Sequence, residues 1–413
     1  MKFNRNIFGW MMYDFANSSF TTIIVTVVFS KYFVHTVVNQ GEYGTALWGR
    51  AISISMLLVA ISAPIFGAIA DHSRAKKKFL FINTYLTIIF TALLYFVTAG
   101  DVLKGMIFFI IANFGYNSAN VFYNALLPEI VNRQNLGKVS GWGWAFGYIG
   151  GLSALFLILP LVNNNLIRFI FPLVAVFFFI FSLFTFVFLK EMERESKRTN
   201  YFKSAFFRIK TSFSHFRKFK ELSKFFLSYL IYNDGIVIVI SFAAIYGATR
   251  FGMNTKDLIK YFIIAQVTSM IGAFTFGYIL DKIGAKKTIS ITLFIWILVV
   301  LGAFFCETIN QFYLVGLLAG LAIGSSQSSS RTMLALLTPD SKMAEFFGFY
   351  SFSGKMASII GPIVYGEIAR ITSSQKWSIL SVLAFFLIGM IFLQTVNETK
   401  GKQIAIEWEP EDS

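Results

Sequence analysis

Two stretches far apart in the chain, GAIADHSRAKKK (67–78) and GYILDKIGAKK (277–287), share one pattern of glycine, aspartate and basic residues. Asp71 aligns with Asp281. Each stretch ends one apolar run, and its basic cluster enters the next. The repetition predicts that the chain consists of two related halves.

A second pair of stretches supports this prediction. NALLPEIVNRQNLGK (124–138) resembles LALLTPDSKMAEFFGF (334–349), with Pro128 on Pro339, at nearly the same separation as the first pair. Internal repeats of this kind are typical of secondary transporters, whose substrate site lies near the middle of the membrane between the repeats.

The composition of the 413-residue chain indicates a protein solvated by lipid. Hydrophobic residues make up 56% and charged residues 14%, whereas soluble proteins carry about 25% charged residues. The 50 Phe, 17 Tyr and 7 Trp suit helix walls in lipid and membrane interfaces. Cys306 has no partner for a disulfide, and three scattered histidines offer no metal-ligand spacing. We therefore expect no metal and no cofactor.

Twelve apolar runs are long enough to cross a bilayer core of about 30 Å as helices. They are 10–36, 44–70, 79–99, 105–127, 139–162, 167–189, 225–249, 258–280, 288–306, 311–337, 343–370 and 376–397. Asp14 and Asn17 interrupt the first run, which favours a retained helix over a cleaved signal peptide.

The predicted fold class is an all-α membrane protein with twelve transmembrane helices in two six-helix bundles. The expected parts are a first bundle, a basic linker, a second bundle and a tail: 1–189, 190–224, 225–397 and 398–413. Within the linker, Phe202, Phe206 and Phe213 recur at helical spacing between basic residues, which favours an amphipathic helix on the inner leaflet. A solvated flexible linker is the alternative.

The basic residues, which give a net charge of +15, predict the orientation. Most of the 36 Lys and Arg residues fall at the N-terminus, in alternate loops and in the linker, and cytoplasmic loops carry such an excess. Both termini are therefore expected in the cytoplasm, with the chain in a bacterial inner membrane. We expect anionic lipid headgroups as partners of this surface, a monomer, and no binding to nucleic acid.

The stretch 67–78 is similar to the signature G-x-x-x-D-R-x-G-R-R/K of the major facilitator superfamily, from which it departs at His72 and Ala75. WMMYDFANSSFTT (10–22), with YNALLPEI and GKVSGWGWAFGYIGG (123–130 and 137–151), resembles one branch of that superfamily. That branch contains the fungal vacuolar amino-acid effluxers of autophagy and their bacterial relatives. The resemblance implies the twelve-helix facilitator fold and transport of amino acids.

The resemblance also implies a gate at the cytoplasmic ends of the repeated helices. In related transporters the aspartate of the signature lies against a helix N-terminus and a nearby arginine, and locks that side closed. The expected gating residues are Gly67, Asp71, Arg74, Asp281 and Lys282. A role of the basic cluster in topology alone is compatible with this.

Asp14 is the most informative single residue, since an ionisable group within a span is costly and is by default a functional candidate. Asp234 occupies the corresponding place in the seventh span. We expect both residues to be candidates for proton coupling. The alternative places Asp14 near the end of its helix, where the helix dipole and interfacial water accommodate it.

Amide side chains line one face of the fourth span, at steps of three and four residues. This face favours a polar cavity, and hydrogen bonding between helices is the alternative. The candidate substrate-binding residues are Asn17, Asn113, Asn117, Asn120, Asn124, Tyr123, Gln266, Gln327 and Lys355. Lys355 could instead extend to the inner interface.

These features favour a secondary active transporter of a small polar solute, amino acids first, working by alternating access and coupled to protons. Peptides, sugars or nucleosides are alternative solutes. A non-transporting receptor or sensor on the same fold is an alternative class. We expect no enzyme activity and no catalytic residue, because no catalytic cluster lies at one depth.

Overall fold

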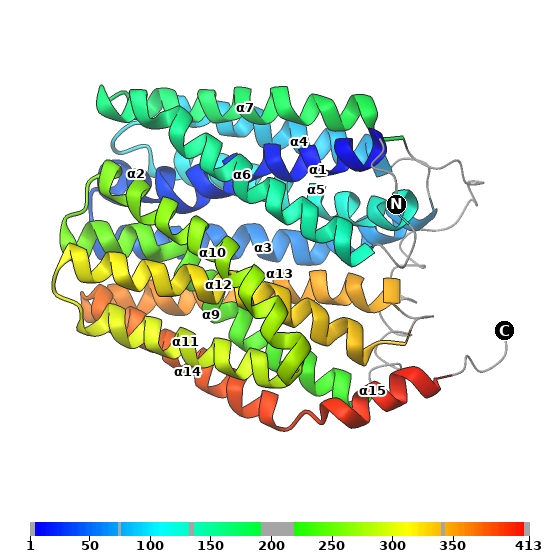
Figure 1. Ribbon diagram of the computed structural model, residues 1–413. Coiled ribbons are helices and arrows are strands. Elements are labelled where there is room, and N and C mark those ends of the chain that lie inside the picture. The colour runs from blue at the N-terminus through cyan, green and yellow to red at the C-terminus, as the bar shows by residue number, and fades with distance from the viewer. Residues whose placement is uncertain (1–4, 73–75, 132–135, 191–218, 340–342, 409–413) are drawn as a thin grey trace. The chain divides into compact units, whose positions relative to one another are not determined.

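In the computed structural model the chain is described over residues 5–72, 76–131, 136–190, 219–339 and 343–408. These residues are helical and form no strand (Figure 1). The first half contains α1 Arg5–Ser19, η1 Phe20–Val27, α2 Phe29–Tyr32, η2 Phe33–Val38, α3 Gly41–His72, α4 Lys76–Leu93, η3 Leu94–Phe96, α5 Val102–Ile130, α6 Leu136–Asn163 and α7 Ile167–Phe188. The second half contains α9 Lys220–Phe251, α10 Thr255–Ile283, α11 Ala285–Phe305, α12 Ile309–Leu337, α13 Met343–Thr372, α14 Gln375–Gln394 and α15 Glu398–Glu407.

Every apolar run predicted as a span coincides with a helix or, for the first run, with a series of helical segments. In the described part of the chain, 11 helices are long and apolar enough to cross a membrane. α13 is not among these 11, and the side chains of several of its residues lie outside the described set. The predicted amphipathic linker helix, with Phe202, Phe206 and Phe213, lies outside the described residues.

The chain divides into two compact units. One comprises Met1–Phe206 and Ser241–Lys260, and the other Phe207–Ile240 and Tyr261–Ser413. The last part of α9 thus belongs to the first unit. There the indole nitrogen of Trp48 donates to the carbonyl oxygen of Ser241 at 3.3 Å.

The first unit is built around aromatic side chains. α1 packs against α6 and α7, and α5 packs against α3 and α4. Trp48 and Phe109 are fully buried, and their ring centroids lie 4.2 Å apart. Phe29 joins the same cluster. Because such rings bury a large apolar area, this cluster is a principal element of the unit's core.

The second unit packs α11 against α12 and α14, and α13 against α14. Trp296 stacks on Phe386 at 5.2 Å and donates to the hydroxyl of Ser326 at 2.9 Å. A Cβ at Gly324 would lie 1.9 Å from the carbonyl oxygen of Ser269. Glycine at this position therefore allows α10 and α12 to approach closely.

The first span is not a regular α-helix. It is wound in wider π-type turns over Phe20–Val27 and Phe33–Val38, and the N–H of Val28 donates to the carbonyl oxygen of Ile23, five residues earlier. π-type turns are rare and frequently occur at functional sites. These turns directly follow the helical segment that carries Asp14 and Asn17.

Candidate functional site

Asp14 lies in α1, in the first third of the span Arg5–Val38, and is half-buried. Its Oδ2 accepts a hydrogen bond from the hydroxyl of Tyr123 in α5 at 2.8 Å. The Tyr123 ring stacks between Trp10 and Tyr13, with ring centroids 4.4 Å and 4.8 Å away. Trp10 donates in turn to the Tyr123 carbonyl oxygen at 3.1 Å. The hydroxyl that binds the Asp14 carboxylate therefore belongs to a ring that is fixed by packing against two other aromatic rings.

Glycines of α6 form the other wall around Asp14. A Cβ at Gly143 would lie 2.6 Å from Asp14 Oδ2, and one at Gly150 would lie 2.1 Å from the Phe15 carbonyl oxygen. A Cβ at Gly147 would lie 3.0 Å from the hydroxyl oxygen of Ser18. These glycines let α1 and α6 approach closely, since larger side chains would not fit between the helices.

Asn17 lies one turn beyond Asp14 and is 3% exposed. Its side-chain nitrogen is buried and has no hydrogen-bond partner among the described residues. Because buried polar groups in proteins are nearly always hydrogen-bonded, this donor is a candidate for binding a polar solute.

The four asparagines predicted to lie on one face of α5 differ in burial and in their contacts. Asn113 is buried and donates to the Ser55 hydroxyl of α3 at 2.6 Å. Asn117 donates back to the Asn113 carbonyl oxygen at 2.9 Å. Asn120 is half-buried and Asn124 is exposed. Asn113 thus bonds two helices together, and the amides farther along the helix are more accessible.

The second unit contains a related arrangement around Asp234 in α9. Asp234 is 4% exposed, and its two carboxylate oxygens accept from the backbone N–H of Gly361 in α13, each at 3.0 Å. A Cβ at Gly361 would lie 2.2 Å from Asp234 Oδ1. In each unit, therefore, an aspartate of the first long helix faces a glycine of the fifth.

The remaining predicted binding residues of the second unit are half-buried and come from different helices. Gln266 lies in α10, Gln327 in α12 and Lys355 in α13. Beside Lys355, a Cβ at Gly354 would lie 3.1 Å from the Tyr229 hydroxyl. Tyr229 stacks on Tyr350 at 4.2 Å.

The predicted gating residues lie at the ends of α3 and α10. Gly67 and Asp71 are in the last turns of α3, and Arg74 lies outside the described residues. Asp281 is exposed, and Lys282, beside it, lies over the Tyr278 ring at 4.7 Å.

A buried ion pair lies next to the first predicted gate. Lys76 at the start of α4 is bound to Glu129 at the end of α5, and the two side chains are 5% and 4% exposed. The pair ties the beginning of one helix to the end of the next.

The sequence of the chain matches the family model described as "Vacuole effluxer Atg22 like" over residues 44–405. The chain belongs to the Atg22-like family. An MFS-type transporter of Bacillus subtilis, YxiO, is 28% identical over 98% of this chain and 97% of its own. Autophagy-related protein 22 of Kluyveromyces lactis is 23% identical over 72% of this chain and 68% of its own.

Solved structures show that this Atg22-like chain has the major facilitator fold. A bacterial homolog of the human lysosomal transporter Spinster, in an inward-facing conformation, matches with a TM-score of 0.72 and 13% identity over 98% of both chains. The nucleoside transporter NupG matches with a TM-score of 0.68 and 14% identity over 95% of this chain and 99% of its own. The chain is a multi-pass membrane transporter of this type, and its relatives are not enzymes.

Some hydrogen bonds close to the two aspartates of this Atg22-like protein could not be predicted from the sequence. Tyr13 is hydrogen-bonded to the Thr84 hydroxyl at 2.8 Å, and Tyr232 to the Ser330 hydroxyl at 2.6 Å. Hydroxyl residues are common in apolar helices and gave no signal of their own. Gly361 did offer a signal in the sequence, because it stands directly before Pro362. A proline inside a helix removes one backbone hydrogen bond and kinks the helix.

Proposed function

We propose that the protein is a secondary active transporter that moves a small polar solute, amino acids first, by alternating access of twelve helices in two six-helix bundles. Family membership supports the transporter class, and the resemblance of its first half to vacuolar amino-acid effluxers supports the solute class. The half-buried Asp14 carboxylate within the first span is the observation that carries the mechanism.

Asp14 is the proposed coupling group. A carboxylate within a span needs a partner, and the Tyr123 hydroxyl supplies one at 2.8 Å without neutralising the charge. The side chain stays partly accessible, so that a proton can reach it. The nearby donor of Asn17 is the proposed contact for an oxygen of the solute.

Asp234 has a different proposed role. Its carboxylate is bound by the Gly361 backbone at 3.0 Å and is almost fully buried. A carboxylate enclosed in this way positions α13 beside α9 and exchanges protons less readily than the accessible Asp14. Lys355, six residues before Gly361 on α13, is the proposed partner of a solute carboxylate.

The proposed orientation places both termini in the cytoplasm of a bacterial cell, in the inner membrane, because the basic residues concentrate in alternate loops. The proposed gate remains the pair of repeated stretches that carry Asp71 and Asp281. Neither proposal depends on the identity of the solute.

Uptake into proteoliposomes tests this function. Purified protein should accumulate a radiolabelled amino acid from an equimolar mixture when a pH gradient is imposed, and should exchange it without a gradient. Asp14→Asn should keep the exchange and lose the gradient-driven accumulation. Asp101→Asn, which changes a carboxylate in the loop before α5, is the matched control and should keep both the exchange and the gradient-driven accumulation.

Three results would contradict different parts of the proposal. Gradient-driven accumulation that is equal in the wild type and in Asp14→Asn would exclude coupling through Asp14. Exchange of nucleosides, sugars or peptides in place of amino acids would keep the transporter and change its solute. Binding without any exchange would favour the sensor alternative.

A further inference from the structure

A cavity of about 600 Å³ opens where α14 ends and α11 begins in the second unit. It is lined by Ile283, Gly284, Lys286, Lys287, Gln394, Thr395, Val396, Asn397, Glu398, Thr399 and Lys402. The residues come from two helix ends and from the segment that leads into α15. The cavity therefore exists only because this C-terminal segment is docked.

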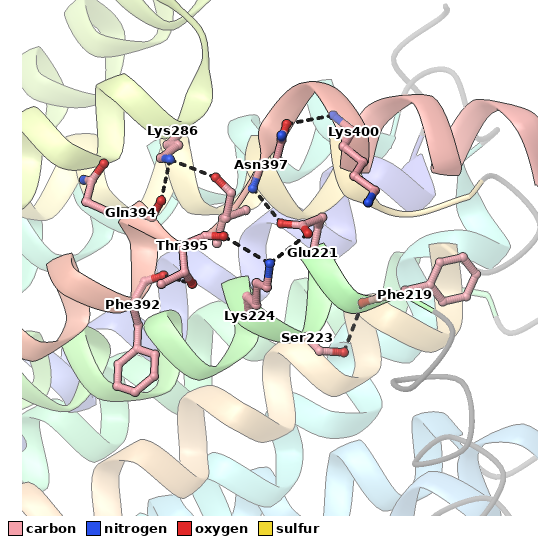
Figure 2. Close-up of polar contacts among 11 residues, drawn as sticks. Phe219, Glu221, Ser223, Lys224, Lys286, Phe392, Gln394, Thr395, Asn397 and Lys400 are labelled. Carbon is pink, nitrogen blue, oxygen red and sulfur yellow. Dashed lines mark hydrogen bonds and ion pairs between the residues drawn. The ribbon is translucent and has the colours of Figure 1, made fainter.

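Hydrogen bonds to the start of α9 hold the segment in place (Figure 2). Glu221 accepts from the backbone N–H of Asn397 at 2.6 Å. Lys224 donates to the Thr395 carbonyl oxygen at 3.2 Å and pairs with Glu221 at 2.9 Å. One wall of the cavity is thus fixed by a network that does not use the lysines lining it.

The single carboxylate in the lining is already engaged by the protein. Glu398 accepts from the backbone N–H groups of Ala285 and Lys286, at 3.2 Å and 2.9 Å, and pairs with Lys402 at 2.6 Å. Two of the N–H groups that a helix start leaves unsatisfied are thereby bonded. The charge of Glu398 is balanced at one side of the cavity.

Lys286 and Lys287 add positive charge that Glu398 does not offset. The Lys286 ammonium donates to the carbonyl oxygens of Gln394 and Val396, at 2.9 Å and 2.8 Å, which carry no net charge. Lys287 is exposed and lines the same cavity. With three lysines and one glutamate in the lining, the cavity is suited to an anion.

Exposed apolar stripes lead away from this basic cavity along two neighbouring helices. On α11, Ile291, Phe294 and Leu298 follow Lys287 at steps of four, three and four residues and are 42%, 55% and 42% exposed. On α14, Ile391 is 65% exposed and precedes Gln394 by one turn. α11 and α14 pack together, and both are long and apolar enough to cross a membrane.

We propose that this cavity binds the phosphate-bearing headgroup of an anionic phospholipid, with its acyl chains lying along the apolar stripes of α11 and α14. Lys286, Lys287 and Lys402 bind the phosphate. A free phosphate would use only the lysines, whereas a phospholipid uses the lysines and the apolar stripes together. The combination of a basic cavity and adjoining apolar surface favours the lipid.

Native mass spectrometry of the detergent-purified full chain tests this proposal, with equal amounts of dioleoylphosphatidylglycerol and dioleoylphosphatidylcholine as probes. The wild type should retain the anionic lipid preferentially. Lys287→Gln combined with Lys402→Gln should weaken its retention by about 30-fold, or about fivefold for each lysine near an anionic lipid. The matched control, Lys282→Gln with Lys400→Gln, removes two exposed lysines outside the lining and should retain it fully.

Equal retention of the two lipids, or equal losses in the double variant and its control, would overturn the proposal. Glycerol phosphate that competes as well as the intact phosphatidylglycerol would assign the cavity to a soluble phosphate instead. Lys287→Gln alone covers the case in which loss of Lys402 undocks α15, because the ion pair and backbone hydrogen bonds of Glu398 that hold α15 use Ala285, Lys286 and Lys402. It should still weaken the retention about fivefold.

Discussion

The Tyr123 hydroxyl donates to the Asp14 carboxylate at 2.8 Å, although the two residues are 109 positions apart in the sequence. Tyr123→Phe removes this bond and leaves the ring stacked on Trp10 and Tyr13. A hydrogen bond to a charged group contributes about 1.5–3 kcal/mol. If Asp14 carries the coupling, gradient-driven uptake should fall by about tenfold or more.

The unfolding temperature of Tyr123→Phe should stay close to that of the wild type, because the aromatic packing remains. Tyr85→Phe is the control, since it removes a tyrosine hydroxyl from α4 while the ring stays stacked on Phe81. Unchanged uptake in Tyr123→Phe would show that the bond to Asp14 has no part in transport.

Gly361→Ala should destabilise the second unit. The new Cβ would lie 2.2 Å from Asp234 Oδ1, so that α13 or the carboxylate must move. Overpacking of this kind costs about 1–3 kcal/mol. Thermal unfolding in detergent measures it, and Gly277→Ala is the matched control, because nothing lies within 4 Å of its Cβ. Equal unfolding temperatures for the two variants would contradict the close packing.

Removing one member of the buried pair Lys76 and Glu129 should be strongly destabilising. Lys76→Met or Glu129→Leu leaves the partner buried without its counterion, which costs about 3–5 kcal/mol. The double variant Lys76→Met with Glu129→Leu should recover most of this loss. Denaturant unfolding of the three variants gives the coupling between the residues.

The corresponding single and double variants of the pair Lys104 and Asp101, which lies closer to the solvent, supply the control. Their side chains are 42% and 28% exposed, and water screens such a pair, so little coupling is expected. A coupling for Lys76 and Glu129 as small as that of the exposed pair would mean that the buried pair contributes nothing to stability.

Docking of α15 should depend on pH through Glu398. Burial alone would raise the pKa of this carboxyl, but hydrogen bonds from Lys402 and from the N–H groups of Lys286 and Ala285 hold the pKa below its ordinary value. The folded carboxyl is therefore more acidic than in the unfolded chain, so its stabilising effect is complete above the ordinary pKa of about 4.3. It is lost as the pH falls through the lowered pKa.

Hydrogen exchange of the α15 amides, corrected for intrinsic rates, measures this docking. Protection should be unchanged between pH 7 and about 5 and should decrease below about 4. Glu398→Gln should lower the protection at neutral pH and reduce the acid-dependent step to the part that Glu221 contributes through its bond from the Asn397 N–H. A step of the same size in the Glu398→Gln variant would assign it to another group.

Most of the fold could be predicted because a chain that crosses lipid must satisfy its backbone hydrogen bonds within the protein. Runs of apolar residues of sufficient length become helices when no water is present to bind the backbone. The boundaries agree within a few residues at nearly every span, as at α6 and α7. The π-type turns over Phe20–Val27 were not predicted, because an apolar run looks the same for either kind of turn.

The candidate site was less predictable, because sequence spacing identifies a helix face and does not identify its neighbour. Asn113 and Asn124 lie on one predicted face, yet Asn113 bonds to Ser55 and Asn124 is exposed. Asp14 and Asp234 had the same signal, a carboxylate within a span. Only the tertiary contacts, a hydroxyl for one and a backbone N–H for the other, distinguish them.

Lys76 and Lys286 occupy the same position in the two repeated stretches, but they have different partners. Lys76 is paired with a carboxylate, whereas Lys286 donates to two backbone carbonyls. Lys76 thus ties the start of α4 to the end of α5, whereas Lys286 ties the start of α11 to the end of α14 and the residues after it. The effect of replacing this lysine in one half therefore does not carry over to the other half.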